Sequence, residues 1–190
     1  ADHGEMLGDH HMSQKNLFFE GSAHVPLLIM PPQGRSLPHN ISVEAPADLV
    51  DIYPTILAMA GLSSPVSVSG KNLLEPVPMD RIFFGNSLNR NFCVMEEKVK
   101  LVYSAVGDHV LLFDLNTDPM EQHNLAEDPA WQERKAKLWK LLLEHTAQYT
   151  PEALDENGQF LTYEAPHFPG DVPGRWFGFH YHDYSVDTFH

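Results

Sequence analysis

The first thirty residues divide into a polar stretch and an apolar stretch. Residues 1–16 are polar, with two glycines and three histidines, and the chain turns apolar over residues 17–30. Residues 25–30 read Val-Pro-Leu-Leu-Ile-Met and are followed by two prolines. A short, continuous apolar run that ends at proline is typical of a fully buried strand in a parallel sheet. We therefore expect such a strand at residues 25–30.

A helix is predicted over residues 51–61. Asp51 can cap its first turn, Pro54 falls inside that turn where no hydrogen bond is lost, and Gly61 supplies a C-terminal stop. Residues 62–80 are rich in Ser, Pro and Gly and are expected to form a surface connection. Helical spacing places four apolar residues on one face: Ile52, Ile56, Leu57 and Ala60.

From residue 81 the pattern changes to short strands with turns between them. The candidate strands are residues 81–84, 92–95, 98–103 and 110–115. Residues 98–103 alternate between polar and apolar, which is typical of a half-exposed antiparallel strand.

A second helix is predicted to begin at Asp128-Pro129, with an N-cap followed by proline at the first helical position. Strands followed by one amphipathic helix predict a small antiparallel α+β subdomain over residues 81–150. The buried stripe of this helix is expected to be Leu138, Leu141, Leu142, His145 and Tyr149.

Charge and cysteine content narrow the function classes. The 190 residues include 12 Lys+Arg and 26 Asp+Glu, a formal charge of −14. This acidity argues against nucleic acid as a partner, because phosphate backbones bind basic surfaces. No apolar run approaches the length of a membrane span. Cys93 is the only cysteine, which excludes an internal disulfide and thiolate metal sites, and we expect it to be buried and inert.

The candidate chemistry lies near residue 1. Asp2 and His3 are adjacent, and Gly4 permits the sharp turn that would let both side chains reach one ion. A carboxylate favours Ca²⁺ or Mg²⁺, and an imidazole extends the choice to Mn²⁺ or Zn²⁺. Lys15 follows His3 by twelve residues and can neutralise the oxyanion of an ester. Taken alone, an Asp-His-Gly triplet is weak, and an isolated lysine is usually a surface residue.

Four ordered blocks carry a resemblance to a known family. Residues 2–10 with Lys15 resemble the C-terminal metal segment of the type I sulfatases, which belong to the alkaline-phosphatase-like superfamily. Residues 20–29 are similar to the family strand E-x-x-x-[RH]-V-P-L-I, and residues 48–57 to its helix D-[IL]-x-P-T-[IL]-L. Residues 113–125 are similar to its signature Y-D-L-x-x-D-P-x-E-x-x-N-L.

The resemblance implies roles residue by residue. Asp2 and His3 match two ligands of the family's single divalent ion, usually Ca²⁺, with Mg²⁺ or Mn²⁺ as alternatives. Lys15 matches the active-site lysine that contacts the sulfate group or its bridging oxygen. The last block, which includes Asp114, Asp118, Pro119 and Asn124, shapes the C-terminal subdomain and is assigned no chemistry.

Substrate contacts are expected from three histidines. His11 stands where the family commonly has Gly, and Ser13 where it has an aromatic residue, both between the metal pair and Lys15. His10 and His11 are therefore candidate substrate contacts. His24 matches a His/Arg position before the apolar run, and we keep it as a candidate contact although a structural role is favoured over a catalytic one.

The resemblance also implies what this chain does not contain. The family nucleophile is a formylglycine made from Cys or Ser in a C/S-x-P-S-R motif, and Val-Met-Glu follows Cys93. The family's N-terminal Asp-Asp metal pair is missing as well. We expect a C-terminal portion of a sulfatase that acts on sugar or aryl sulfate esters, needs the N-terminal portion of the same protein, and is inactive alone.

Alternative functions stay open. A phosphonate monoester or phosphodiester hydrolase of the same superfamily shares the same residue types, and an isolated chain of this kind can also be a non-catalytic structural module. A periplasmic or secreted location fits the family, and a cytoplasmic one is not excluded by the sequence.

The predicted fold class is α/β. Residues 1–80 are expected to be the C-terminal part of an alkaline-phosphatase-like α/β domain, residues 81–150 the small antiparallel α+β subdomain, and residues 151–190 an aromatic and His-rich extension. In that extension, His180, His182 and Asp183 have the spacing of metal ligands on a strand, but a packed tail is the favoured interpretation.

Overall fold

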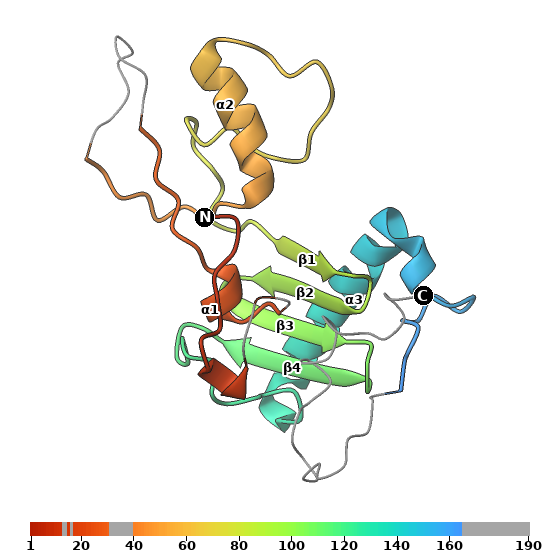
Figure 1. The fold of residues 1–190 in the computed structure, drawn as a ribbon. Coiled ribbons are helices and arrows are strands. Elements are labelled where there is room, and N and C mark those ends of the chain that lie inside the picture. The colour runs from red at the N-terminus through yellow and green to blue at the C-terminus, as the bar shows by residue number, and fades with distance from the viewer. Residues whose placement is uncertain (13–14, 16, 31–39, 165–190) are drawn as a thin grey trace. The chain divides into compact units, whose positions relative to one another are not determined.

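The computed structural model describes residues 1–12, 15, 17–30 and 40–164. Contacts between Cα atoms divide the chain into two units (Figure 1). The first unit holds Ala1–Asp2 and Pro26–Arg81, and the second holds His3–Val25 and the described residues from Ile82 onward. Each unit is described separately.

The second unit contains a four-stranded antiparallel sheet. Its strands are β1 (Phe83–Ser87), β2 (Asn91–Glu96), β3 (Val99–Ser104) and β4 (His109–Asp114), and they lie in sequence order. Each strand therefore pairs with its neighbour along the chain through a short turn. The prediction of a small antiparallel sheet is confirmed, with strand bounds shifted by one to three residues.

One face of this sheet is covered by α3 (Gln132–Tyr149) (Figure 1). The chain enters α3 through a 3-10 turn at Pro129–Trp131, where the Asp128 carboxylate accepts the Ala130 N–H at 2.8 Å, as the cap pattern predicted. Leu138 and Leu142 are fully buried against the strands. The predicted stripe is wrong at Tyr149, which is 61% exposed, whereas Thr146 in the same last turn of α3 is buried.

The opposite face is covered by the chain around residues 3–25. Short helix α1 (Glu20–Ala23) and a 3-10 turn (Asp9–His11) belong to this segment. Four of its side chains pack on four side chains of the sheet: Met6, Met12, Leu17 and Phe19 on Cys93, Val102, Leu111 and Phe113.

Strand β3 is consequently buried at every position, which contradicts the half-exposed strand expected from its alternating pattern. Val99, Leu101 and Tyr103 of β3 face α3, whereas Lys100 and Val102 face the residue 3–25 segment. The polar position that indicated solvent is in fact occupied by a paired, buried charge.

Lys100 is the centre of that buried charge cluster. It is 3% exposed, and its ammonium donates to the Phe18 carbonyl at 2.8 Å, to Glu121 Oε1 at 2.9 Å and to Glu20 Oε1. The other Glu121 oxygen, Oε2, accepts the backbone N–H of Glu20 at 2.7 Å. Burial lowers the pKa of Lys100, but the facing carboxylates outweigh it and raise that pKa above its ordinary value. The ammonium therefore stays charged and fastens residues 18–20 to the sheet.

Cys93 lies on the same face and is buried, as predicted. Burial raises the pKa of its thiol to about 12, so the thiolate is not populated at neutral pH. A group in this state is unsuited to nucleophilic attack.

In the first unit the predicted helix is confirmed as α2 (Ile52–Ala60), which ends at Gly61 with a left-handed φ of 75°. Asp51 does not cap the first turn of α2 with its side chain, contrary to the expectation. Its carboxylate instead holds Arg81 in a two-atom pair of 2.5 and 3.0 Å, and it accepts the backbone N–H groups of Lys71 and Asp48. Asp51 is fully buried and joins three stretches of this unit.

The buried strand predicted at residues 25–30 is not formed. Leu28 is 92% exposed and Met30 89% exposed, and residues 25–30 have no regular secondary structure. The sheet that the structure describes lies in the other unit, so this run has no strand to pair with among the described residues. Ile52 and Ile56 on the apolar face of α2 are likewise exposed. None of the described helices is long and apolar enough to cross a membrane.

Replacing Lys100 with Met is expected to destabilise the second unit by about 3–5 kcal/mol, because two carboxylates lose their buried cation. Urea unfolding followed by Trp fluorescence measures this change. The control is Lys137→Met, which removes a half-exposed lysine paired with Glu96 at 2.5 Å and is expected to cost less than about 1 kcal/mol. Equal losses in the two variants would contradict a special role for Lys100.

Replacing Arg81 with Met is expected to make the amide hydrogens of α2 exchange at least about tenfold faster, because hydrogen bonds to a buried charge are lost. Burial raises the pKa of Asp51, but the bonds from Arg81, Lys71 and Asp48 outweigh it and hold that pKa below its ordinary value. A depressed carboxyl pKa stabilises the fold above the unfolded-state pKa, and this contribution is lost as pH falls through the folded-state pKa.

Hydrogen exchange from neutral to acid pH measures both effects, and the acid-dependent part should be smaller in the Arg81→Met variant, which keeps only the bonds from Lys71 and Asp48. Lys71→Met is the matched control, because Lys71 reaches Asp51 only through its backbone N–H. A faster α2 exchange in the control would show that the effect is not specific to the Asp51–Arg81 pair.

Candidate functional site

The backbone that carries His3 lies alongside α1. The Gly4 N–H donates to the Ser22 carbonyl at 2.8 Å, and the Glu5 N–H donates to the Gly21 carbonyl at 3.0 Å. A Cβ atom on Gly4 would lie 2.1 Å from the Gly21 oxygen, so this approach requires glycine. The glycine that follows the Asp-His pair therefore serves close backbone packing within the second unit.

His3 and Lys15 meet through their side chains. The Lys15 ammonium lies 2.8 Å from His3 Nε2, and His3 Nδ1 lies 2.8 Å from the Gly4 carbonyl oxygen. An ammonium has only donors and a carbonyl only accepts, so Nε2 accepts from Lys15 while Nδ1–H donates to Gly4. The two contacts select a neutral imidazole with its lone pair on Nε2. Both side chains are exposed.

This tautomer is the form in which histidine binds a metal ion. A ligating imidazole offers one nitrogen lone pair and commonly donates its other N–H to a carbonyl, as His3 does to Gly4. Asp2 is exposed and belongs to the first unit. Among residues 1–12, 15, 17–30 and 40–164, no three His, Cys, Asp or Glu side chains gather as a complete metal site. The donor chemistry of Asp2 and His3 therefore fits part of an oxygen- and nitrogen-ligated site.

Two of the three predicted substrate-contact histidines, His10 and His24, contact residues of their own segment. His10 has a left-handed backbone (φ 53°), and its ring stacks on Phe19 with 4.1 Å between centroids. His24 is exposed and lies 2.9 Å from Glu20, one helical turn earlier. His11 belongs to the same 3-10 turn as His10, and its side chain lies outside the described part of the structure.

The signature block at residues 113–125 forms a set of turns. Asp114 accepts from Asn116 and Thr117, and Asp118 accepts the His123 N–H at 2.8 Å. Asn124 Oδ1 accepts the N–H groups of Leu112 and Ala126. These bonds are local and structural. They shape the turn in which Glu121 lies, and Glu121 accepts a hydrogen bond from Lys100.

Four residues that the sequence did not single out support the His3–Lys15 pair. Ser22 donates its hydroxyl to the Lys15 carbonyl at 2.6 Å, and Lys100 with Glu20 and Glu121 fastens α1 to the sheet. The glutamates were visible as letters of two family blocks. The sequence did not reveal Lys100 as buried, because it occupies a polar position of an alternating strand that was expected to be half exposed. Ser22 occupies a position where the family pattern admits any residue.

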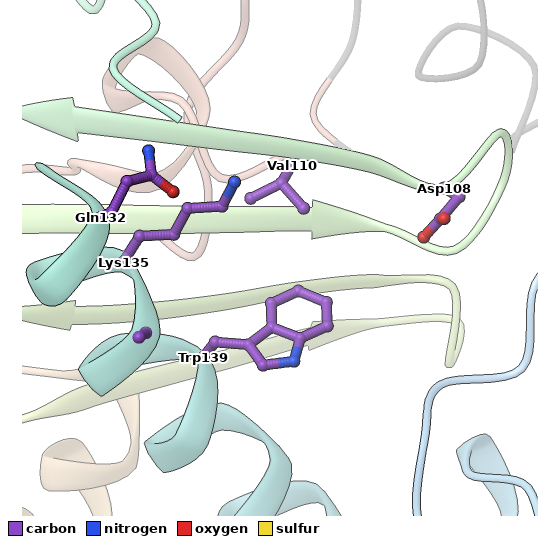
Figure 2. A pocket seen from close by; sticks show the side chains of 6 residues that line it. Asp108, Val110, Gln132, Lys135 and Trp139 are labelled. Atoms are coloured by element: carbon purple, nitrogen blue, oxygen red, sulfur yellow. The ribbon is translucent and has the colours of Figure 1, made fainter. Parts of the chain in front are cut away.

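A separate hollow of about 370 Å³ lies beside α3 (Figure 2). Its polar groups have partners in the protein: Lys135 donates to the Ala126 carbonyl at 2.7 Å, and Asp108 accepts from the Tyr103 hydroxyl at 3.0 Å. No residue predicted from the sequence as functional lines it, and we assign it no role. The full lining is Asp108, Val110, Gln132, Lys135, Ala136 and Trp139.

The candidate metal residues His180, His182 and Asp183 lie outside the described residues.

Curated relatives of this chain are sulfatases. Cattle arylsulfatase K is 35% identical over 146 residues, which cover 66% of this chain and 26% of the relative. Choline-sulfatase of Rhizobium meliloti is 35% identical over 167 residues, which cover 82% of this chain and 31% of the relative. The chain thus spans about a quarter to a third of the length of these relatives. No family model matches it.

Solved structures give the same fold. A putative sulfatase from Bacteroides thetaiotaomicron aligns with a TM-score of 0.64 and 21% identity, covering 92% of this chain and 42% of that one. A phosphonate monoester hydrolase from Silicibacter pomeroyi aligns with a TM-score of 0.63 and 27% identity, covering 82% and 36%. The predicted fold class is confirmed, and the chain is homologous to the sulfatases, with the fold of the alkaline-phosphatase-like superfamily.

Proposed function

We propose that this chain is part of a sulfuric ester hydrolase in which Lys15 and His3 belong to the active site. The observation that carries the proposal is the 2.8 Å contact between the Lys15 ammonium and His3 Nε2, in a chain whose relatives are sulfatases. The contact brings a cation and a metal-type ligand, separated by twelve residues, to one place. A sulfate ester needs positive charge at its oxygens, which an acidic protein must supply locally.

Asp2 and His3 would hold a divalent cation, with Ca²⁺ preferred and Mg²⁺ or Mn²⁺ as alternatives. The bound cation would supply positive charge to the oxygens of the ester. His3 is prepared for this role by its bond to Gly4, which fixes the ring proton on Nδ1 and puts the lone pair on Nε2, where Lys15 donates to it. The remaining ligands would come from an N-terminal portion of the same protein.

Lys15 would bind the anionic ester and stabilise charge on the departing oxygen. Its ammonium has three donors and sits at the end of a flexible stem, so it can follow an oxygen as that oxygen gains charge. With a cation held by Asp2 and His3, Nε2 would no longer accept from Lys15, and the Lys15 ammonium would be able to bind the ester. The lysine would thus have one partner before metal binding and another partner after it.

The nucleophile would also come from the N-terminal portion, as a formylglycine. Cys93 is excluded from that role, since its thiol is buried and its pKa is raised by burial to about 12. The substrate class would be a sugar or aryl sulfate ester.

The second candidate function is phosphonate monoester or phosphodiester hydrolysis. The likeness to a phosphonate monoester hydrolase at 27% identity favours it. A lysine and a divalent ion serve either ester, because sulfate and phosphonate monoesters share oxygens of similar geometry.

As an isolated chain the 190 residues would act as a non-catalytic module, which is consistent with the incomplete ligand set among the described residues.

The longer protein is expected to hydrolyse an aryl sulfate with a higher kcat/KM than the matching aryl phosphonate. Release of nitrophenol from paired substrates measures this ratio. The 190-residue chain alone should give no turnover. A strong preference for the phosphonate would replace the first function with the second, and clear sulfate turnover by the chain alone would refute the need for an N-terminal portion.

Replacing Lys15 with Met in the longer protein is expected to lower kcat by about 10²–10³, because a preorganised donor to the developing oxyanion is removed. The control is Lys140→Met, which removes an exposed lysine in α3 that lies 3.8 Å from Glu144. Steady-state kinetics and thermal melting are measured for both variants. An unchanged kcat in Lys15→Met would remove Lys15 from the active site.

A further inference from the structure

We infer that Ser22 is a positioning residue that sets the distance between Lys15 and His3. It touches neither substrate nor metal, and it acts through the backbone of the two segments that carry these side chains. The inference rests on the proposed function for its effect on catalysis. Its geometric content stands on the structure alone.

Ser22 contacts both segments at once. Its hydroxyl donates to the Lys15 carbonyl at 2.6 Å, and its own carbonyl accepts the Gly4 N–H at 2.8 Å. Gly4 in turn accepts His3 Nδ1–H at 2.8 Å. The route from the Lys15 backbone to the His3 ring therefore passes through two residues, Ser22 and Gly4, and three hydrogen bonds.

Burial makes the Ser22 hydroxyl a specific connection. Ser22 is 3% exposed, so water is poorly placed to replace the hydroxyl if it is removed. Lys15, in contrast, is exposed and has a long, flexible side chain. The short hydrogen bond from Ser22 to the Lys15 carbonyl is thus a buried contact that restrains the Lys15 backbone.

Residues 18–20, which precede Ser22, are bonded to Glu121 and Lys100. The Glu20 N–H donates to Glu121, and Lys100 donates to the Phe18 carbonyl, so the residues before Ser22 are held on the sheet from two directions. The Gly4 backbone approaches Gly21 so closely that a Cβ atom would lie 2.1 Å from its oxygen. The Ser22 hydroxyl bonds Lys15, whereas the bond to the His3 segment uses the Ser22 backbone, so removing the hydroxyl is expected to act mainly on Lys15.

Replacing Ser22 with Ala in the longer protein is expected to lower kcat about tenfold or more, with KM changing less than kcat, because a misplaced donor is costly mainly at the transition state. The matched control is Ser104→Ala. Ser104 is also a fully buried serine of the second unit, and it donates to the Val106 carbonyl at 3.2 Å. Both variants remove one buried hydroxyl, so their melting temperatures are compared.

Nuclear magnetic resonance supplies a reading that does not depend on activity. In the metal-free 190-residue chain, the ¹⁵N shifts of His3 are expected to show Nδ1–H and a lone pair on Nε2. Ser22→Ala should shift them toward a tautomer mixture, because Lys15 no longer meets Nε2 reliably. Ser104→Ala should leave them unchanged.

The outcomes separate the two proposals. If Lys15→Met leaves kcat unchanged, the proposed function fails, and the His3 shifts still decide the positioning role. If Lys15→Met lowers kcat while Ser22→Ala leaves both kcat and the His3 shifts unchanged, the positioning role is overturned. It is also overturned if Ser104→Ala lowers kcat as much as Ser22→Ala does. Where Ser22→Ala does not fold, Ser22→Thr is used, and retained hydroxyl bonding should keep kcat within about threefold of the parent.

Discussion

The buried ammonium of Lys100 is the interaction on which the arrangement of the second unit depends. It joins β3, the residue 18–20 backbone and Glu121, which approach it from three separate parts of the chain. A buried ion pair adds little net stability compared with an apolar replacement, but removing one partner leaves uncompensated charge in the core. The cluster therefore specifies which segment covers this face of the sheet. The segment that it selects is the one that carries His3 and Lys15.

Periodicity predicted the parts of the fold whose burial is decided locally. The antiparallel strands, the Asp128 cap and α3 follow from patterns within a few residues, and they are where they were expected. Periodicity failed where the burial of a residue depends on segments that are distant in the sequence. Lys100 occupies a polar position in an alternating strand, yet a second layer of chain covers it. Residues 25–30 are as apolar as a buried strand, but hydrophobic pattern alone does not supply the neighbouring strands that such a run needs.

The sequence pointed to the candidate site residues but not to the residues that support them. The order of Asp2, His3 and Lys15 indicated a metal site with a cation, and the structure brings His3 Nε2 and the Lys15 ammonium into contact. The sequence did not indicate that His10 would stack on Phe19, because that contact depends on a left-handed turn. Ser22 was also invisible, since a hydrogen bond from a serine hydroxyl to a backbone carbonyl has no signature in residue types.

Two of the family blocks acquire a physical meaning from this arrangement. The glutamate that opens residues 20–29 and the glutamate within residues 113–125 are far apart in the chain, yet both are bonded to Lys100. Glu121 also accepts the Glu20 N–H, so the second block holds the backbone of the first. Ser22 lies in α1 and contacts the segments of His3 and Lys15. The two family blocks therefore hold in place the chain that positions these two candidate site residues. A signature to which no chemistry is assigned can therefore determine where the chain that carries the candidate site residues lies.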